Sequence, residues 1–89
     1  MRRIIRCNEK DNVAILLDDL KQGERITVDG QEVTALEDIP YGHKIALEDM
    51  KAGSFVRKYG ENVARVTKEI KTGEWVHVHN VESIRGLGR

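Results

Sequence analysis

The sequence predicts one small domain that is mainly β, with short helical turns between its strands. Two observations predict this fold class. Short segments alternate apolar and polar residues with a period of two, which is typical of half-buried strands. A seven-residue pattern that ends in glycine recurs between those segments. At 89 residues, the chain can form one compact core but is too short for two domains.

The turn pattern occurs three times, at residues 17–23, 47–53 and 67–73. Each copy contains an acidic residue, an aliphatic residue, a lysine and, two residues later, a glycine. Glycine can adopt the left-handed conformation that ends a helical turn, and lysine is favourable near a helix C-terminus. The copies start thirty and then twenty residues apart, so they indicate a recurring local turn rather than a solenoid, whose period would be constant.

A strand is predicted after each of these glycines, at residues 25–28, 54–57 and 75–79. In the last of these segments two valines alternate with two histidines: Val76, His77, Val78 and His79. The apolar residues before the first turn also fit the spacing of a helix. Because β-branched residues are frequent before the turns, we interpret the preceding segments as strands too.

Other local signals complete the predicted organisation. Asp29-Gly30 is the residue pair that a tight two-residue hairpin requires, so the strand at 25–28 is expected to turn back on itself. Residues 37–42 contain the single proline and are interpreted as a loop. The domain is expected to span residues 1–82, and the glycine-rich residues 83–89 to form a C-terminal tail.

The composition excludes several classes of function. The 15 basic and 15 acidic side chains leave a formal net charge of +0, whereas a nucleic-acid binder normally carries a basic excess. The longest apolar run, residues 13–17, is far shorter than the roughly 20 residues that span a membrane. Cys7 has no second cysteine with which to form an intrachain disulfide. We therefore expect a cytoplasmic protein that binds neither nucleic acid nor membrane.

Histidines mark the candidate site. His77 and His79 lie two residues apart on a predicted strand, so their imidazoles should share one face about 7 Å apart. Such a pair can bind iron, manganese or zinc with carboxylates or water, although a strand face can also carry two histidines by chance. His43 and Lys44 follow Gly42 in a predicted loop. That pair suits a carboxylate or phosphate ligand, or is simply solvated.

Four segments in order cover nearly the whole chain: Asp-Asn-Val-Ala at 11–14, Tyr-Gly-His-Lys-Ile-Ala at 41–46, Lys-Tyr-Gly-Glu at 58–61 and Trp-Val-His-Val-His-Asn at 75–80. Together they resemble the N-terminal region of the altronate dehydratase family. The repeated turn ending in Lys-x-Gly resembles the SAF domain, named for sialic acid synthase, antifreeze and flagellar basal-body proteins. This resemblance implies a β-clip fold, a compact β domain with long, folded-over hairpins.

The resemblance also implies a function. It suggests that the chain is a small subunit or N-terminal domain of a hydro-lyase, which dehydrates D-altronate to 2-keto-3-deoxygluconate together with a large catalytic subunit. The small chain is expected to be inactive alone. The resemblance implies a divalent metal, iron or manganese, held mainly by the large subunit, with His77 and His79 as candidate ligands. The implied catalytic residues are His43, Lys44, His77, His79 and Asn80. Galactarate dehydratase, the small subunit of sulfolactate sulfo-lyase and a non-catalytic module that binds a sugar acid or a partner remain alternatives.

Overall fold

The computed structural model describes residues 4–84, which form nine β-strands and no helix. The predicted mainly β class is therefore confirmed, whereas the predicted helical turns are absent from the described residues. The strands are β1 (Ile4–Ile5), β2 (Val13–Leu16), β3 (Arg25–Val28), β4 (Gln31–Thr34), β5 (Lys44–Ala46), β6 (Phe55–Lys58), β7 (Glu61–Val66), β8 (Trp75–Val76) and β9 (Val81–Ser83).

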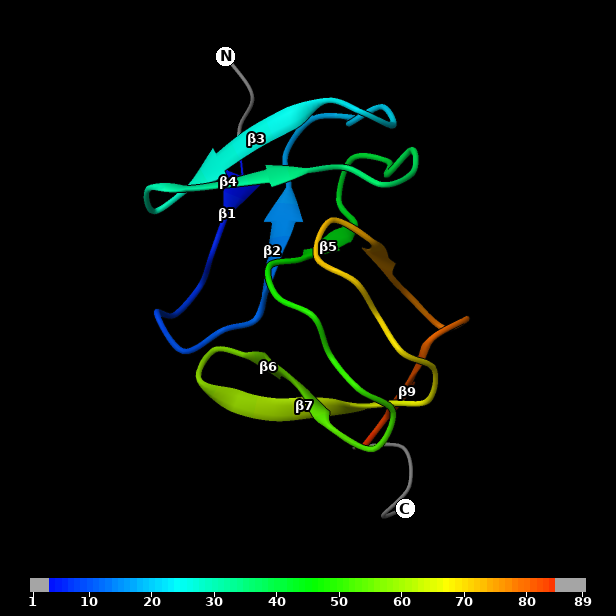
Figure 1. Ribbon diagram of the computed structural model, residues 1–89. Coiled ribbons are helices and arrows are strands. Elements are labelled where there is room, and N and C mark those ends of the chain that lie inside the picture. The colour runs from blue at the N-terminus through cyan, green and yellow to red at the C-terminus, as the bar shows by residue number, and fades with distance from the viewer. Residues whose placement is uncertain (1–3, 85–89) are drawn as a thin grey trace.

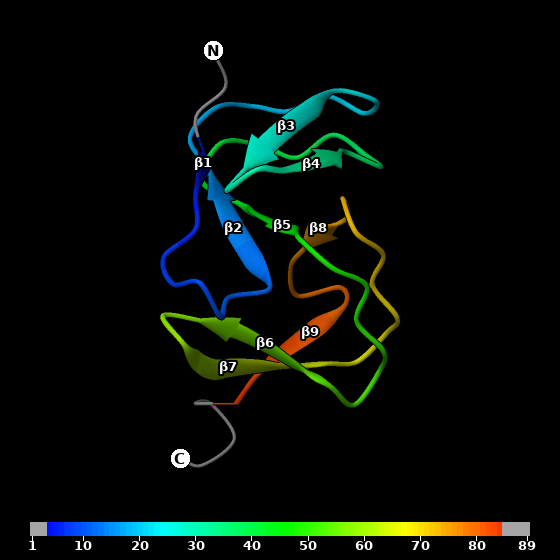
Figure 2. The ribbon, with the colours of Figure 1, turned by 60° about the vertical axis from the view of Figure 1, so that its left-hand side comes forward.

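The strands form three layers. The central sheet has the order β1-β2-β5-β8, one outer layer is the hairpin β3-β4, and the other is the sheet β6-β7-β9. All of the pairings are antiparallel. Figures 1 and 2 show the central sheet between the two outer layers, with β3 and β4 above it and β6, β7 and β9 below it.

The central sheet separates two cores. Ala14, Leu16 and Ile45 face the first core, which they share with β3 and β4. Val13 and Ala46 face the second core, which they share with β6 and β7. A strand that is buried on both faces has few polar residues. This double burial explains why residues 13–17 form an apolar run and lack the alternation of apolar and polar residues that is typical of a half-buried strand.

The turn pattern occurs four times. Turn 1 (17–23), turn 3 (47–53) and turn 4 (67–73) are the predicted copies. Residues 36–42 form turn 2, and they include the segment 37–42 that is interpreted above as a loop. Isolated β-bridges pair turn 1 with turn 2 through Leu20 and Ile39, and turn 3 with turn 4 through Met50 and Ile70. The turns are not helical, because the main-chain N–H groups of the bridge residues bond across to the paired turn.

The acidic residues of the turns stabilise this pairing. Asp38 Oδ1 accepts a hydrogen bond from the main-chain N–H of Gln22 at 2.8 Å, and Asp49 Oδ1 accepts one from Thr72 at 2.8 Å. These carboxylates therefore bind the main chain of the opposite turn. The pKa of Asp49 is lowered, chiefly by the hydrogen bond from the Thr72 main chain and then by the Thr72 hydroxyl.

The two halves of the chain repeat each other. Gly23 N donates to Ala35 O at 2.8 Å, and the equivalent bond in the second half joins Gly53 N to Val66 O at 2.8 Å. Each half also contains a two-residue hairpin tip in which both residues have positive φ, at 29–30 as predicted and at 59–60. The β5 strand closes the first half and opens the second, so both halves share it.

The strand β9 lies at the predicted boundary between the domain and its tail. Ser83, the first residue of the predicted tail at 83–89, is the last residue of β9, which pairs with β7. Residues 85–89 lie outside the described part of the chain. None of the described elements is a helix long and apolar enough to cross a bilayer.

Candidate functional site

The predicted strand at 75–79 is shorter than expected. It ends at Val76, and residues 77–80 form a turn. Asn80 is the physical reason, because its side chain bonds the main chain twice: Oδ1 accepts from His77 N at 3.0 Å, and Nδ2 donates to Trp75 O at 2.9 Å. Asn80 is 2% exposed, so these bonds are shielded from water. Asn80 thus shapes the turn that carries His77 and His79.

Three histidines gather around one tryptophan, and we call His43, Trp75, His77 and His79 the imidazole cluster. The His77 ring stacks on the Trp75 indole, with ring centroids 5.3 Å apart and an angle of 16° between the planes. The His43 ring meets both of them edge-on, at 5.0 Å from Trp75 and 5.1 Å from His77. The His79 ring lies 6.5 Å from that of His77. The fold thus joins histidines from two distant motifs.

Trp75 orients His43. Its indole Nε1–H donates to His43 Nδ1 at 3.2 Å, so the hydrogen of the neutral imidazole resides on Nε2. The main-chain N–H of Trp75 donates to Glu37 Oε2 at 3.2 Å, and the indole packs against the first core. A ring with a fixed orientation and a defined N–H can transfer a proton. Trp75 therefore belongs to the site. In the sequence, Trp75 stood out only as part of the segment at 75–80 and was not among the predicted site residues.

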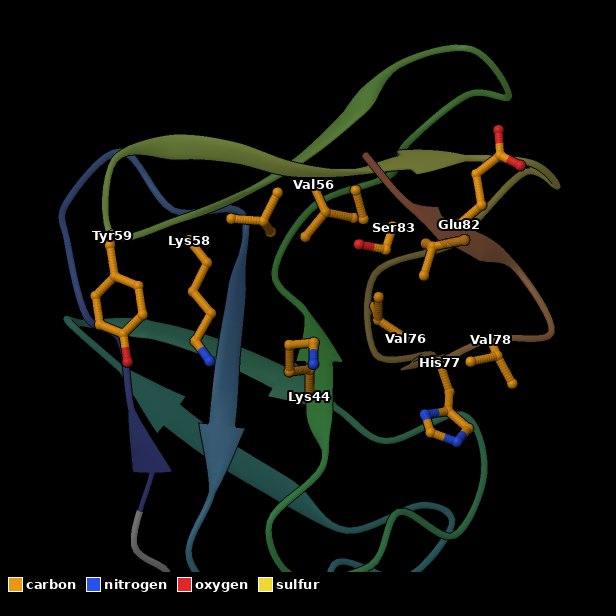
Figure 3. Close-up of a pocket in the computed structure, with 12 residues that line it drawn as sticks. Lys44, Val56, Lys58, Tyr59, Val76, His77, Val78, Glu82 and Ser83 are labelled. Atoms are coloured by element: carbon orange, nitrogen blue, oxygen red, sulfur yellow. The ribbon is translucent and has the colours of Figure 1, made fainter. Parts of the chain in front are cut away.

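The Lys44 side chain lies on the opposite side of β5 from the His43 ring, because successive residues of a strand point to opposite faces. Its side chain lines a groove of about 540 Å³. Figure 3 shows this groove, with Lys58 and Tyr59 on one side and His77 on the other. Burial lowers the pKa of Lys44, and the charge of Lys58 lowers it further. The two functional residues of the Gly-His-Lys motif thus lie in different regions, His43 in the imidazole cluster and Lys44 in the groove. Of the three histidines, only His77 belongs to both regions.

The groove wall is held by a buried carboxylate. Asp11 is 1% exposed, and its two oxygens accept hydrogen bonds from Tyr59 N at 3.0 Å and Gly60 N at 2.9 Å. Asn12 accepts from Arg57 N at 2.8 Å. The two Asp11 bonds join the segments at 11–14 and 58–61, which the sequence singled out separately. Nothing in one sequence indicates that they touch, because 48 residues separate the partners.

Comparison with known proteins identifies the family. Residues 2–84 match the family described as the altronate/galactarate dehydratase SAF domain. The chain belongs to this family. The predicted resemblance is therefore confirmed.

The SAF domain is also similar to individual curated proteins. It is 36% identical over 83 residues to altronate dehydratase of Bacillus subtilis (strain 168), covering 93% of this chain and 17% of that protein. It is 40% identical over 79 residues to altronate dehydratase of Escherichia coli (strain K12), covering 89% of this chain and 16% of that protein. The chain therefore spans about a sixth of these relatives. It is 43% identical over 53 residues to (2R)-sulfolactate sulfo-lyase subunit alpha of Paracoccus pantotrophus, covering 60% of this chain and 79% of that subunit.

The donor atoms of this SAF domain do not complete a metal site. Within residues 4–84, no three His, Cys, Asp or Glu side chains are gathered closely enough to hold a metal ion. His77 and His79 could offer two imidazoles, whereas zinc, iron and manganese sites in proteins use at least three protein ligands in most cases. The described residues therefore do not fit a complete iron or manganese site by themselves.

Proposed function

We propose that this SAF domain is the small subunit or N-terminal domain of a sugar-acid hydro-lyase, which dehydrates D-altronate to 2-keto-3-deoxygluconate together with a large catalytic chain. One observation carries the proposal: three histidines from two distant segments converge around Trp75 in a chain related to altronate dehydratases. In this proposal the reaction is a step of cytoplasmic hexuronate catabolism.

The reaction needs groups that the imidazole cluster can provide. Dehydration removes a proton from the carbon next to the carboxylate and expels the hydroxyl of the neighbouring carbon as water. A base must accept the first proton, and an acid must protonate the departing hydroxyl. Imidazole can act as either near neutral pH. We assign these steps to His43, His77 and His79, with Trp75 and Asn80 as positioning residues.

The large chain has to supply the rest of the site. The groove beside the imidazole cluster is open, and the described residues offer too few ligands for a metal. In the proposal, an iron or manganese ion held by the large chain would stabilise negative charge on the substrate. The 89-residue chain alone is then expected to show no dehydration of D-altronate, even when iron or manganese is added.

The test is a double substitution in the assembled enzyme. We expect His77→Ala with His79→Ala to lower turnover at least about tenfold, because a positioned acid or base typically contributes 100-fold or more. Folding should survive, because Asn80 still bonds the turn, and loss of the ring stacking costs about 0.5–1.5 kcal/mol. Lys51→Ala, on the exposed surface of turn 3, is the matched control. Full turnover by the double variant would show that His77 and His79 take no part in catalysis.

A second candidate substrate class follows from the sulfo-lyase relative. The match covers 79% of the alpha subunit of (2R)-sulfolactate sulfo-lyase of Paracoccus pantotrophus. This relationship makes (2R)-sulfolactate the second candidate substrate for the proposed enzyme. Assaying the assembled enzyme with D-altronate, galactarate and (2R)-sulfolactate in parallel distinguishes the candidates. Binding of these acids without turnover would instead support the non-catalytic module.

A further inference from the structure

The groove behind the imidazole cluster has the size and lining of a small-molecule site. Its volume of about 540 Å³ lies within the range of about 300–1,000 Å³ that is usual for ligand pockets. Aliphatic side chains form much of the lining: Val56, Val63, Ala64, Val76, Val78 and Val81. Polar groups from two layers surround them, the central sheet with the turn after β8 and the β6-β7-β9 sheet: Lys44, Lys58, Tyr59, His77 and Ser83. An apolar floor with a few convergent polar groups is typical of a binding site for a small organic molecule.

The charges in this groove lack a counter-ion. Among the described residues, six other cationic side chains form ion pairs with carboxylates. Lys44 and Lys58 form none, and both are half-buried. The other lysines in the described part of the chain that lack a carboxylate partner are exposed: Lys10, Lys51 and Lys68. Two like charges that are partly withdrawn from water are unfavourable unless an anion joins them.

The acidic residue in the groove lining does not provide that anion. Glu82 accepts two hydrogen bonds from the Arg65 guanidinium, one of them from Nε at 2.8 Å. Figure 3 shows its carboxylate directed away from Lys44, whereas the Lys58 side chain extends towards Lys44. Lys58 Nζ also lies 5.1 Å from the centre of the Tyr59 ring. The two ammonium groups therefore remain available to an external ligand.

We propose that Lys44 and Lys58 form a carboxylate-binding site for a small polyhydroxy acid. The paired ammonium groups would bind the carboxylate, while Tyr59, Ser83 and His77 offer hydrogen-bonding groups to hydroxyls along the chain of the acid. The aliphatic floor would contact its C–H groups. This inference rests on the proposed function for the biological identity of the acid, and it assigns the binding of the carboxylate to lysines on the far side of β5 from His43.

The scaffold holds both lysines in place before a ligand arrives. Lys44 lies on β5, which pairs with β2 on one side and β8 on the other. Lys58 ends β6, directly before the hairpin tip that Asp11 bonds twice. A site whose groups stand on paired strands needs little ordering on binding. The main-chain positions of the two lysines are thus set by different parts of the fold.

The experiment is a titration of the 89-residue chain, followed by NMR of its main-chain amides. Sodium D-gluconate serves as the polyhydroxy acid, D-mannitol as its uncharged counterpart, and sodium sulfate as a generic anion. We expect gluconate to shift the amides of Lys44, Lys58 and Ser83 in a saturable manner. Lys44→Gln with Lys58→Gln should weaken binding at least about tenfold, because charge-assisted hydrogen bonds are lost. Lys51→Gln with Lys68→Gln removes the same charge from the exposed surface and should leave binding unchanged.

Several results would overturn the inference. They are the absence of a saturable shift, equal binding of mannitol or sulfate, and unchanged binding by the Lys44 and Lys58 double variant. If the large chain, but not gluconate, perturbed these amides, the groove would be a protein-docking surface instead. The titration measures binding by the isolated chain, so its result is independent of the turnover assay on His77 and His79. Failure of one proposal can therefore be told from failure of the other.

Discussion

Replacing Gly73 with alanine is expected to destabilise the domain more than replacing Gly53, although the two glycines occupy the same position in turns 4 and 3. Both have a φ of +93°. A Cβ atom built on Gly53 meets no atom within 4 Å, whereas one built on Gly73 lies well inside 3.0 Å of Thr34 O and 3.1 Å from Thr34 C. Turn 4 packs directly on the end of β4 at this point, so alanine at 73 must displace main chain.

The magnitude follows from the contacts that would move. At either position alanine in the left-handed region costs about 1–2 kcal/mol. At Gly73 the displacement also weakens the bond from Leu36 N to Gly73 O, 3.0 Å long, and that from Gly73 N to Ala46 O, 2.9 Å long. Two such bonds contribute about 0.5–1.5 kcal/mol each, so Gly73→Ala should cost about 1–3 kcal/mol more than Gly53→Ala. A domain of this length has a total stability of roughly 4–13 kcal/mol.

Urea unfolding followed by fluorescence of Trp75, the single tryptophan, measures both variants. With a denaturant dependence of about 1 kcal/mol per molar urea, the Gly73→Ala midpoint should lie about 1–3 M below that of Gly53→Ala. Gly73 also lies close to the candidate site, because Trp75 follows two residues later and orients His43. Midpoints that agree within about 0.5 M would refute the close approach of turn 4 to Thr34.

Two further predictions concern Asn80 and Lys44. Asn80→Ala should lower stability by about 2 kcal/mol or more in thermal unfolding, because it removes the side chain that bonds His77 N and Trp75 O. The control is His79→Ala, which removes an exposed side chain and should cost less than about 0.5 kcal/mol. Equal losses of stability would contradict the role of Asn80. Lys44→Met should raise the melting temperature at pH 7. Burial and Lys58 lower the pKa of Lys44 below its ordinary 10.5, so the native state binds fewer protons than the unfolded state between the lowered pKa and 10.5. Wild-type stability therefore rises with pH in that window, and the advantage of the variant should shrink as pH approaches 10.5; a constant advantage would contradict it.

Local signals in the sequence predicted local structure well. The strand expected at 25–28 is β3, and Asp29-Gly30 forms the tip of its hairpin, because that pair tolerates the two positive φ angles that a tight turn needs. Turn 2 was interpreted as a loop because Pro40 stands where the other copies have lysine, which hid a repeat whose backbone bonds are the same. Side-chain identity thus concealed a conserved backbone geometry.

Predictions that depended on tertiary contacts were less accurate. The alternation of valine and histidine predicted a strand as far as His79, but the Asn80 side chain takes the hydrogen bonds of His77 N and Trp75 O and ends β8 at Val76. The sequence also places His43 and Lys44 side by side, but the structure brings the His43 ring to His77 and directs Lys44 into the groove on the other side of β5. Lys44 diverges because it lies on a strand, where neighbours point to opposite faces.

The shared strand β5 explains why both candidate regions lie where they do. Each half of the chain satisfies its paired turns through main-chain bonds and carboxylates, so the pairing of turns 1 to 4 does not depend on the histidine side chains. Where the halves join, His43 precedes β5 on the side of the first core, and Lys44 begins it on the side of the second. The closing strand of the second half, β8, pairs with β5 and leads directly into His77, which touches the His43 ring and lines the groove of Lys44. A duplicated scaffold therefore places imidazole and ammonium groups on opposite sides of one strand, with His77 in contact with both regions.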